Sequence, residues 1–359
     1  MRADDLPAAG RRLMKPTRVL VVDDSAAMRM ALSRILASDP QIEVVGAAPE
    51  PHAAREMIRA LNPDVVTLDV EMPGMDGLAF LERIMRLRPM PVVMVSSLTA
   101  AGAETTVDAL RLGAVDCVAK PSGGPAGWQQ DAALLCQTVR DAASSRARRT
   151  HVQRRAPGVA VRAGFRPRVV AIAASTGGVE ALFHILPQFP ADCPPTLVVQ
   201  HMPAAFTASF ARRLDRDCAV RVCEARDGAP LRPGTVYIAP GGTHHMILDG
   251  GIAGTVRLVA QDKVNGHRPS ADLLFRSVAP LGEKAVGVIL TGMGDDGARG
   301  LLAMRAAGAC TFAQTRGCCV VWGMPRVALE IGAVDQEVSL SHMAGTILAA
   351  CRDGQHREP

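Results

Sequence analysis

The sequence predicts an α/β protein with two open, mostly parallel, doubly wound sheets, each covered by helices on both faces. The chain has 359 residues, a length at which two domains are the default. Short segments rich in Val, Ile and Leu alternate with amphipathic stretches, which is the pattern of parallel strands buried on both faces. Polar residues follow these apolar segments directly, at the strand ends where open α/β sheets bind ligands.

The composition excludes several classes of protein. Hydrophobic residues make up 48% and charged residues 21% of the chain, which is ordinary for a globular protein. No apolar run reaches the ~18 residues of a membrane-spanning helix, and the stretch from Met1 to Lys15 has no apolar signal-peptide core. Nine cysteines without a Cys-x-x-Cys pair favour reduced thiols over disulfides or a zinc site. We therefore expect a cytoplasmic protein that does not insert into membranes.

The positive charge is concentrated in one segment. The net charge is +5, but the stretch from Arg140 to Arg168 alone carries +8, so the rest of the chain carries −3. This distribution argues against a basic nucleic-acid-binding domain, and we expect no nucleic-acid partner. Such a segment is typical of a solvated spacer, and contact with an acidic partner is the alternative. We expect residues 144–167 to form a flexible, Arg-rich linker.

The first domain is expected over residues 17–143, after an N-terminal extension of residues 1–16. Its apolar runs predict strands at 18–22, 43–47, 64–68, 91–95 and 115–119. The amphipathic stretches between them predict helices at 26–36, 53–61, 78–87 and 104–110. A further helix over 128–143 is expected to pack back on the same sheet.

Polar residues follow four of these five strands. They are Asp23 and Asp24, Asp69, Ser96 and Lys120. Three carboxylates at one edge repel each other unless a cation joins them, and hard oxygen ligands suit Mg²⁺. A lysine and a hydroxyl opposite them would suit a phosphoryl group on one carboxylate. Helix capping by Asp24 and Ser25 is the alternative, but a cap explains one acid and leaves the others without a role.

The segments VLVVDDSAAMR, DVVTLDVEMPGMDGL, VVMVSSLT and DCVAKP resemble the receiver domain of two-component response regulators. The resemblance implies a flavodoxin-like (βα)5 fold. It also implies roles for the polar residues: Asp69 as phosphoacceptor, Asp23 and Asp24 with Asp69 as Mg²⁺ ligands, Ser96 as switch hydroxyl and Lys120 as phosphate partner. Receivers usually carry an aromatic residue three positions before this lysine, and Cys117 stands there instead.

The second domain is expected over residues 168–352. A buried strand at 169–174 runs into Ser175, Thr176 and two glycines, with a helix pattern behind them. Further strands are expected at 196–200 and 285–290, with helices at 205–214, 270–281 and 298–307. Shorter strands at 220–223, 235–239, 245–248 and 256–259 suggest an inserted antiparallel section.

Ser175 is a candidate nucleophile. A sharp turn from strand to helix exposes its hydroxyl and places backbone N–H donors beside an anionic intermediate. His201 and the pair Asp295–Asp296 follow neighbouring strands, and a serine, a histidine and an acid are the parts of an acyl-transfer triad. The candidate oxyanion donors are the backbone N–H groups of Thr176, Met293 and Gly294.

Other interpretations stay open at this point. Turns in which a serine stands between small residues also bind phosphate, and many are only tight turns. His244, His245 and His267 are rival bases, and either of the paired aspartates could cap the helix that starts at Ala298.

The segments AASTGG, VVQHMP, YIAPGGTHHM, NGHRPSADLLFRS, LTGMGDDGARG and VVWGMPRVA resemble the catalytic domain of the chemotaxis protein-glutamate methylesterase family. The resemblance implies Ser175 as nucleophile, His201 as base and Asp296 as the third member. Asp296 is preferred over Asp295 because the family's loop reads Gly-Met-Gly, a variable polar residue, then Asp-Gly. Ala173 stands where the family often has glycine.

Together the two resemblances imply a phosphorylation-activated serine hydrolase of chemosensory adaptation. It would demethylate glutamyl methyl esters on methyl-accepting chemoreceptors, releasing methanol, and deamidate glutamines. The chemotaxis histidine kinase would supply the phosphoryl group, with Mg²⁺ in the receiver and no cofactor in the esterase site. In this family the unphosphorylated receiver lies over the active site. The alternatives are a receiver-linked transcription factor, suggested by the basic linker, and an inactive receptor-binding module.

Overall fold

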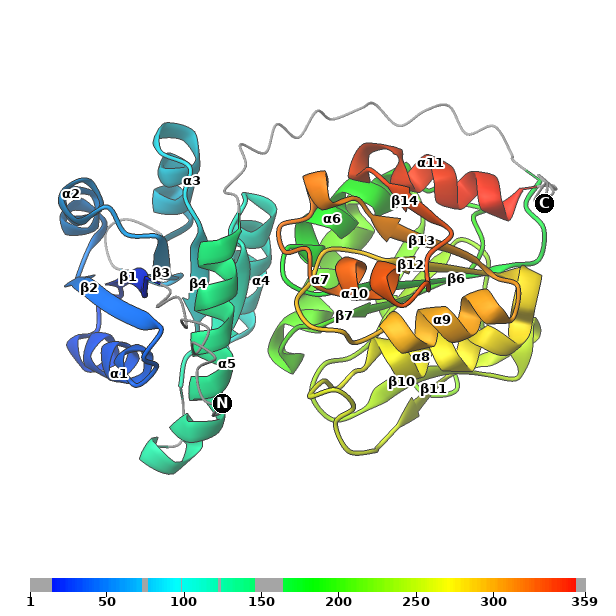
Figure 1. Ribbon diagram of the computed structural model, residues 1–359, viewed down its shortest axis with the longest axis horizontal. Coiled ribbons are helices and arrows are strands. Elements are labelled where there is room, and N and C mark those ends of the chain that lie inside the picture. The colour runs from blue at the N-terminus through cyan, green and yellow to red at the C-terminus, as the bar shows by residue number, and fades with distance from the viewer. Residues whose placement is uncertain (1–14, 73–76, 98, 122–123, 146–163, 353–359) are drawn as a thin grey trace, which may run out of the picture.

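The computed structural model describes residues 15–72, 77–97, 99–121, 124–145 and 164–352. Within these ranges the chain forms two α/β units, each built on its own parallel sheet (Figure 1). The first sheet has the strand order β2-β1-β3-β4-β5, and the second has the order β14-β13-β12-β6-β7-β9-β8. The predicted fold class, two parallel sheets with helices, is therefore confirmed.

The first unit alternates strands and helices as the apolar pattern predicts. Its strands are β1 (Thr17–Val22), β2 (Ile42–Ala48), β3 (Val65–Asp69), β4 (Val92–Ser96) and β5 (Asp116–Ala119), and every pair is parallel. Its helices are α1 (Ala26–Ala37), α2 (Pro51–Leu61), α3 (Gly77–Leu87), α4 (Ala100–Arg111) and α5 (Gly124–Ser144).

Side-chain caps explain where two of these helices begin. The Ser25 hydroxyl accepts a hydrogen bond from the Met28 N–H at the start of α1, and Thr99 accepts one from the Gly102 N–H at the start of α4. Capping of α1 is therefore done by Ser25, so Asp24 is not used in this way.

The second unit is centred on β6 (Val169–Ala174), in which all six residues are buried. The other strands of its sheet are β7 (Thr196–Gln200), β8 (Arg221–Glu224), β9 (Thr235–Ile238), β12 (Ala285–Ile289), β13 (Cys310–Gln314) and β14 (Gln336–Val338). Its α-helices are α6 (Gly178–Ile185), α7 (Ala204–Asp217), α8 (Ala271–Val278), α9 (Ala298–Ala306), α10 (Met324–Glu330) and α11 (Leu340–Cys351). Because β6 lies in the middle of the sheet, Ser175 leaves the centre of its carboxyl edge.

Some details differ from the sequence-based expectation. Among the strands of the described residues, only β10 (His245–Asp249) and β11 (Thr255–Val259) pair antiparallel, whereas β8 and β9 join the main sheet as parallel strands. The helix expected to reach residue 281 ends at Val278 and continues as a 3₁₀ turn. The strands β13 and β14 were not predicted.

Other expectations concern cysteines, membrane spans and the linker. All nine cysteines lie in the described ranges and are free thiols. Across the described residues, no helix is both long enough and apolar enough to cross a bilayer. Most of the expected linker, residues 146–163, lies outside the described residues.

The two units pack against each other through α4 of the first and α6 and α7 of the second (Figure 1). Ion pairs join them: Arg213 Nε lies 2.9 Å from Asp108 Oδ1, and Arg212 lies 3.4 Å from Glu104. Such pairs on a partly exposed surface contribute roughly 0–1 kcal/mol each. These ion pairs therefore help to fix the relative position of the two units, although no one of them is a strong interaction.

Candidate phosphorylation and esterase sites

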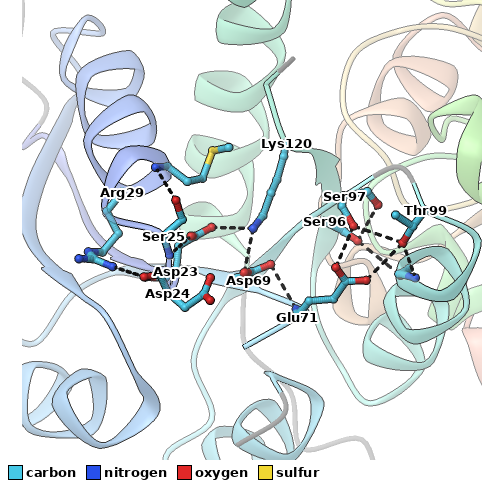
Figure 2. A network of polar contacts seen from close by, with 12 residues as sticks. Asp23, Asp24, Ser25, Arg29, Asp69, Glu71, Ser96, Ser97, Thr99 and Lys120 are labelled. Carbon is cyan, nitrogen blue, oxygen red and sulfur yellow. Dashed lines mark hydrogen bonds and ion pairs between the residues drawn. The ribbon is translucent and has the colours of Figure 1, made fainter. Parts of the chain in front are cut away.

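The carboxyl edge of the first sheet carries three acids and a lysine (Figure 2). Asp23 and Asp69 are buried and Asp24 is exposed, and one oxygen from each lies within 4.8 Å of the others. Lys120 Nζ lies 2.8 Å from Asp69 Oδ2 and 3.0 Å from Asp23 Oδ2. One ammonium does not balance three carboxylates, and their hard oxygens are the donors that Mg²⁺ prefers, so these residues fit that ion.

The pKa of the Asp69 carboxyl is set by opposing effects. Burial raises its pKa, and the hydrogen bond and charge of Lys120 only partly offset this effect. A divalent cation beside it would favour the ionised form.

The Ser96 hydroxyl does not contact Asp69. It is buried and donates to the backbone oxygens of Ser97, at 3.1 Å, and Gly102, at 3.4 Å. Glu71 lies beside it and accepts hydrogen bonds from Ser97 and Thr99 at 3.1 and 3.2 Å (Figure 2). The predicted switch residue therefore points toward the start of α4 in this structure.

Ser175 and His201 leave neighbouring strands at the same level. β6 pairs with β7 in parallel, with Ala174 opposite Gln200. The His201 N–H donates to the Ala174 oxygen at 3.0 Å, and Gln200 Nε2 donates to the backbone oxygens of Ser175 and His201, each at 3.0 Å. The backbones of the two candidate residues are therefore tied together by one buried amide.

His201 and Asp296 form a buried pair. His201 Nε2 lies 2.9 Å from Asp296 Oδ2, and the carboxylate is 0% exposed. It also accepts hydrogen bonds from Ser270 Oγ and the Ala271 N–H, both at 2.7 Å. Burial by itself raises the pKa of Asp296, but the hydrogen bond and charge of His201, with the other donors, lower it to about 2. The carboxylate is thus ionised near neutral pH.

The remaining nitrogen of His201 is available for chemistry. Its Nδ1 is buried and accepts no hydrogen bond from the described residues. Because Nε2 faces Asp296, the neutral ring carries its proton there and leaves the Nδ1 lone pair free.

The rival residues have other surroundings. His245 uses both ring nitrogens, one with the Ser270 N–H and one with the Asp262 oxygen, each at 3.0 Å. His244 contacts the Thr243 hydroxyl at 2.8 Å. Asp295 is exposed, whereas Asp296 is buried. Neither caps α9 through its side chain, so the capping interpretation is wrong. Asp296 instead accepts the N–H groups that begin α8.

The candidate oxyanion donors lie on two turns that meet at Ser175. The Ser175 N–H donates to the Thr291 oxygen at 3.0 Å, and a Cβ added to Gly292 would lie 2.7 Å from Ser175 Cβ. Only glycine at 292 allows the following residues to come this close. Within the described part of the chain, the backbone N–H groups of Thr176, Met293 and Gly294 donate no hydrogen bond.

The first unit touches the turn that follows Ser175. The Thr176 hydroxyl donates to Asp116 Oδ2 at 2.7 Å, and the Gly177 N–H donates to the Val115 oxygen at 3.2 Å. Burial raises the pKa of Asp116 to about 6, although hydrogen bonds from Thr176 and from the Cys117 N–H act against this. The neighbouring Cys117 is buried at the position that departs from the receiver pattern, and burial raises the pKa of its thiol.

Comparison with known proteins identifies both units. Residues 170–347 match the family model of the CheB methylesterase, and residues 19–126 match that of the response regulator receiver domain. A Caulobacter vibrioides protein named protein-glutamate methylesterase/protein-glutamine glutaminase 1 is 59% identical over 338 residues, which cover 93% of this chain and 98% of that protein. The chain belongs to the CheB methylesterase family.

A further full-length relative and a solved catalytic domain are also similar to this chain. A Bordetella bronchiseptica protein named protein-glutamate methylesterase/protein-glutamine glutaminase is 51% identical over 349 residues, 96% of this chain and 100% of that protein. The crystal structure of the Thermotoga maritima CheB methylesterase catalytic domain is 38% identical and covers 51% of this chain and 97% of that one, with a TM-score of 0.49.

Several residues near these sites were not singled out from sequence. They are Gln200, which ties Ser175 to His201, Ser270 and Asn265, which contact Asp296, Glu71, which bridges Ser97 and Thr99, and Asp116, which contacts Thr176. The signal for three of them was present, because Gln200, Asn265 and Ser270 fall inside the segments VVQHMP and NGHRPS that carry the family resemblance.

Proposed function

We propose that this protein hydrolyses glutamyl methyl esters on methyl-accepting chemoreceptors, deamidates selected glutamines there, and is activated by phosphorylation of Asp69. The observation that carries the proposal is the buried His201–Asp296 pair beside Ser175, in a chain with relatives named protein-glutamate methylesterase/protein-glutamine glutaminase. The ionised acid and the free Nδ1 of His201 are what a serine hydrolase needs in a base.

The proposed chemistry follows from these positions. Ser175 Oγ attacks the ester carbonyl as His201 Nδ1 takes its proton, and Asp296 stabilises the resulting imidazolium through Nε2. The N–H groups of Thr176, Met293 and Gly294 stabilise the oxyanion. His201 then protonates the departing methoxide, releasing methanol. Water attacks the acyl-enzyme with His201 again as base, and the glutamate side chain is released. A glutamine substrate loses ammonia instead.

The proposed control begins at the receiver edge. Asp69 accepts the phosphoryl group from the chemotaxis histidine kinase, and Lys120 and the Ser96 hydroxyl then contact its oxygens. Asp23, Asp24 and Asp69 would hold Mg²⁺, which supplies charge neutralisation for phosphoryl transfer. Since the Ser96 hydroxyl points toward α4, its rotation to the phosphate changes the start of the helix that packs on α7.

The contact between the units supports an inhibitory role for the unphosphorylated receiver. Asp116 and Val115 bind the residues directly after Ser175, where a receptor segment would approach. A ligand or modification shifts such an equilibrium only through differential contacts with the two states. The phosphoryl group must therefore destabilise the closed arrangement, in which α4 packs on α7, more than it destabilises the open arrangement.

Asp69→Asn is expected to abolish activation while leaving the basal rate. The amide keeps the shape of the side chain but accepts no phosphoryl group. The measurement is methanol release from methylated receptor membranes, with and without a small-molecule phosphodonor and Mg²⁺. Stimulation by phosphodonor that persists in this variant would contradict the assignment of Asp69.

Asp116→Ala is expected to raise the basal rate of methanol release roughly 5- to 30-fold. The substitution removes a half-buried hydrogen bond, of about 1–2 kcal/mol, from the closed arrangement only. The matched variant Asp116→Asn keeps a partner for both Thr176 and the Cys117 N–H, so it should stay inhibited. Equal basal rates in the alanine variant and the native protein would contradict the role of this contact.

The same contact predicts a pH dependence. Burial raises the pKa of Asp116 to about 6, whereas the contacts with Thr176 and His201 of the second unit lower it. We take packing of the second unit to supply part of that burial, so the closed arrangement favours the protonated acid and is weakened as the pH rises through about 6. The ratio of phosphodonor-activated to basal rate should therefore increase as the pH falls from 7 to 5. In Asp116→Asn the ratio should stay flat, and a parallel increase there would assign the effect to another group.

A further inference from the structure

One tight turn touches both members of the His201–Asp296 pair. Val264 and His267 exchange backbone hydrogen bonds of 3.0 and 2.9 Å. Between them Asn265 and Gly266 have φ angles of 52° and 80°. Two successive left-handed residues define the two-residue turn for which Asn-Gly is the preferred sequence. The turn, residues 264–267, is therefore encoded locally by its two central residues.

The side chain of Asn265 reaches the acid. Its Nδ2 donates to Asp296 Oδ1 at 3.2 Å and to Asp272 Oδ2 at 2.8 Å. Asp272 is itself buried and accepts the Gly300 N–H at 2.6 Å. The Asn265 amide thus links the Asp296 carboxylate to a second fixed carboxylate at the start of α8.

The side chain of His267 covers the base. Its ring lies flat on the ring of His201, with centroids 3.8 Å apart and an angle of 5° between the planes. Burial, followed by the charge of His201, lowers the pKa of His267 to about 4. His267 is therefore neutral near pH 7, and its ring adds no second charge when His201 becomes an imidazolium.

We propose that the turn of residues 264–267 is the positioning element of the base–acid pair, in which His267 fixes the plane of the His201 ring and Asn265 fixes the Asp296 carboxylate. His267 touches the base and acts through it, so it is a positioning residue. The inference rests on the proposed serine-hydrolase function for its effect on rate, but its geometry stands on the contacts alone.

The physical reason is the freedom of an imidazole ring about its last torsion. That torsion is broad and roughly two-fold, so the ring is held only by what surrounds it. One hydrogen bond from Nε2 to Asp296 fixes a point on the ring, and the flat contact with His267 fixes its plane. With both contacts in place the lone pair of His201 Nδ1 points in one fixed direction. A fixed direction is the geometric condition for rapid proton transfer from Ser175.

The test compares His267→Ala with His267→Phe. Alanine removes the covering ring, and kcat for methanol release should fall about 10- to 100-fold with KM changed less than about 2-fold. Phenylalanine keeps a flat ring without a titrating group, and kcat should return to within about 3-fold of the native value. His244→Ala, which removes a histidine that hydrogen-bonds the Thr243 hydroxyl, is the control.

A second readout does not depend on esterase activity. The proton shared by His201 Nε2 and Asp296 should give a strongly deshielded NMR signal, which Asp296→Asn removes and thereby assigns. The signal should persist in His267→Phe and broaden or vanish in His267→Ala. Asn265→Gly keeps the left-handed backbone, so this variant should weaken the signal and lower kcat about 10-fold even if the alanine variant folds poorly.

Two results would overturn the proposal. A native kcat and an unchanged proton signal in His267→Ala would show that the stacked ring holds nothing in place. A phenylalanine variant as slow as the alanine variant would show that the imidazole of His267 acts chemically. If the native protein releases no methanol, the proposed function fails, while the NMR comparison still decides whether the turn positions His201.

Discussion

Replacing Ser175 with alanine is expected to lower kcat for methanol release by more than about 10⁴-fold, because removal of the nucleophile of a serine hydrolase leaves only binding and oxyanion stabilisation. The fold should persist. Within the described residues the Ser175 side chain forms no hydrogen bond, whereas its backbone is held by Thr291 and Gln200. The thermal unfolding midpoint is therefore expected to stay within about 2 °C of the native value, since removing a half-buried hydroxyl that has no hydrogen-bond partner among the described residues changes stability little.

Covalent labelling gives an independent check of the same residue. A serine-directed fluorophosphonate should modify Ser175 in the native protein and leave the alanine variant unlabelled. Phosphorylation of Asp69 by a small-molecule phosphodonor should be unchanged, which shows that the receiver half of the variant is intact. Turnover that survives the substitution, or labelling at another serine, would refute the assignment of the nucleophile.

Asp296→Asn is expected to lower kcat by about 10⁴-fold. The native carboxylate accepts hydrogen bonds from His201, Ser270 and the backbone at the start of α8. An amide has one acceptor oxygen, so its NH₂ group must face at least one of these donors. His201 then turns to its other tautomer or loses its orientation, and its lone pair no longer faces Ser175.

The neighbouring acid provides a matched control for this prediction. Asp295 is exposed, and Asp295→Asn should leave both kcat and stability unchanged. Asp296→Asn should also cost roughly 1–3 kcal/mol of folding free energy, because buried donors lose their acceptor. Rates are to be compared below the unfolding midpoint of both variants. A larger loss of kcat in Asp295→Asn would show that the wrong member of the pair had been assigned to the site.

The pKa of the same carboxylate predicts how the free energy of unfolding changes at low pH. The pKa of Asp296 is lowered to about 2 from 3.8, so its contribution to stability is present above pH 3.8 and is lost as the pH falls through about 2. In acid unfolding followed by circular dichroism, the native protein and Asp296→Asn should converge in stability below about pH 2. A constant difference across that range would mean that the variant acts through packing.

Much of the fold was predictable because its strands are short aliphatic runs with polar residues directly behind them. The run TLVVQ is followed directly by His201, and AVGVIL ends just before the loop that carries Asp296. Parallel strands bring such ends to the same edge of a sheet, so the candidate residues could be placed near one another from the order of strands in the sequence. β13, with the sequence CTFAQ, lacks that aliphatic signature and was missed.

The supporting contacts were not predictable in the same way. Asn265 and His267 reach the site through a turn about 30 residues before Asp296 in the sequence, and nothing in periodicity says which histidine stacks on which. The parallel orientation of β8 and β9 depends on the route of the chain across the sheet, which alternation does not encode. Asp116 is an acid at the start of a strand, and its contact with Thr176 arises only from the packing of the second unit, which the sequence pattern does not encode.

The contact of Asp116 and Val115 with the Ser175 turn limits how far the two halves can be treated as interchangeable modules. The proposed phosphorylation chemistry involves Asp69 and Lys120, whereas the contact with the esterase unit is made by the start of β5 and by Asp108 of α4. A receiver transplanted from another response regulator would still accept a phosphoryl group, but without a hydrogen-bonding side chain at position 116 it would not inhibit the hydrolase. Substitutions on the two sides of this contact are therefore expected to occur together. A chimera should keep both sides of the contact from the same protein.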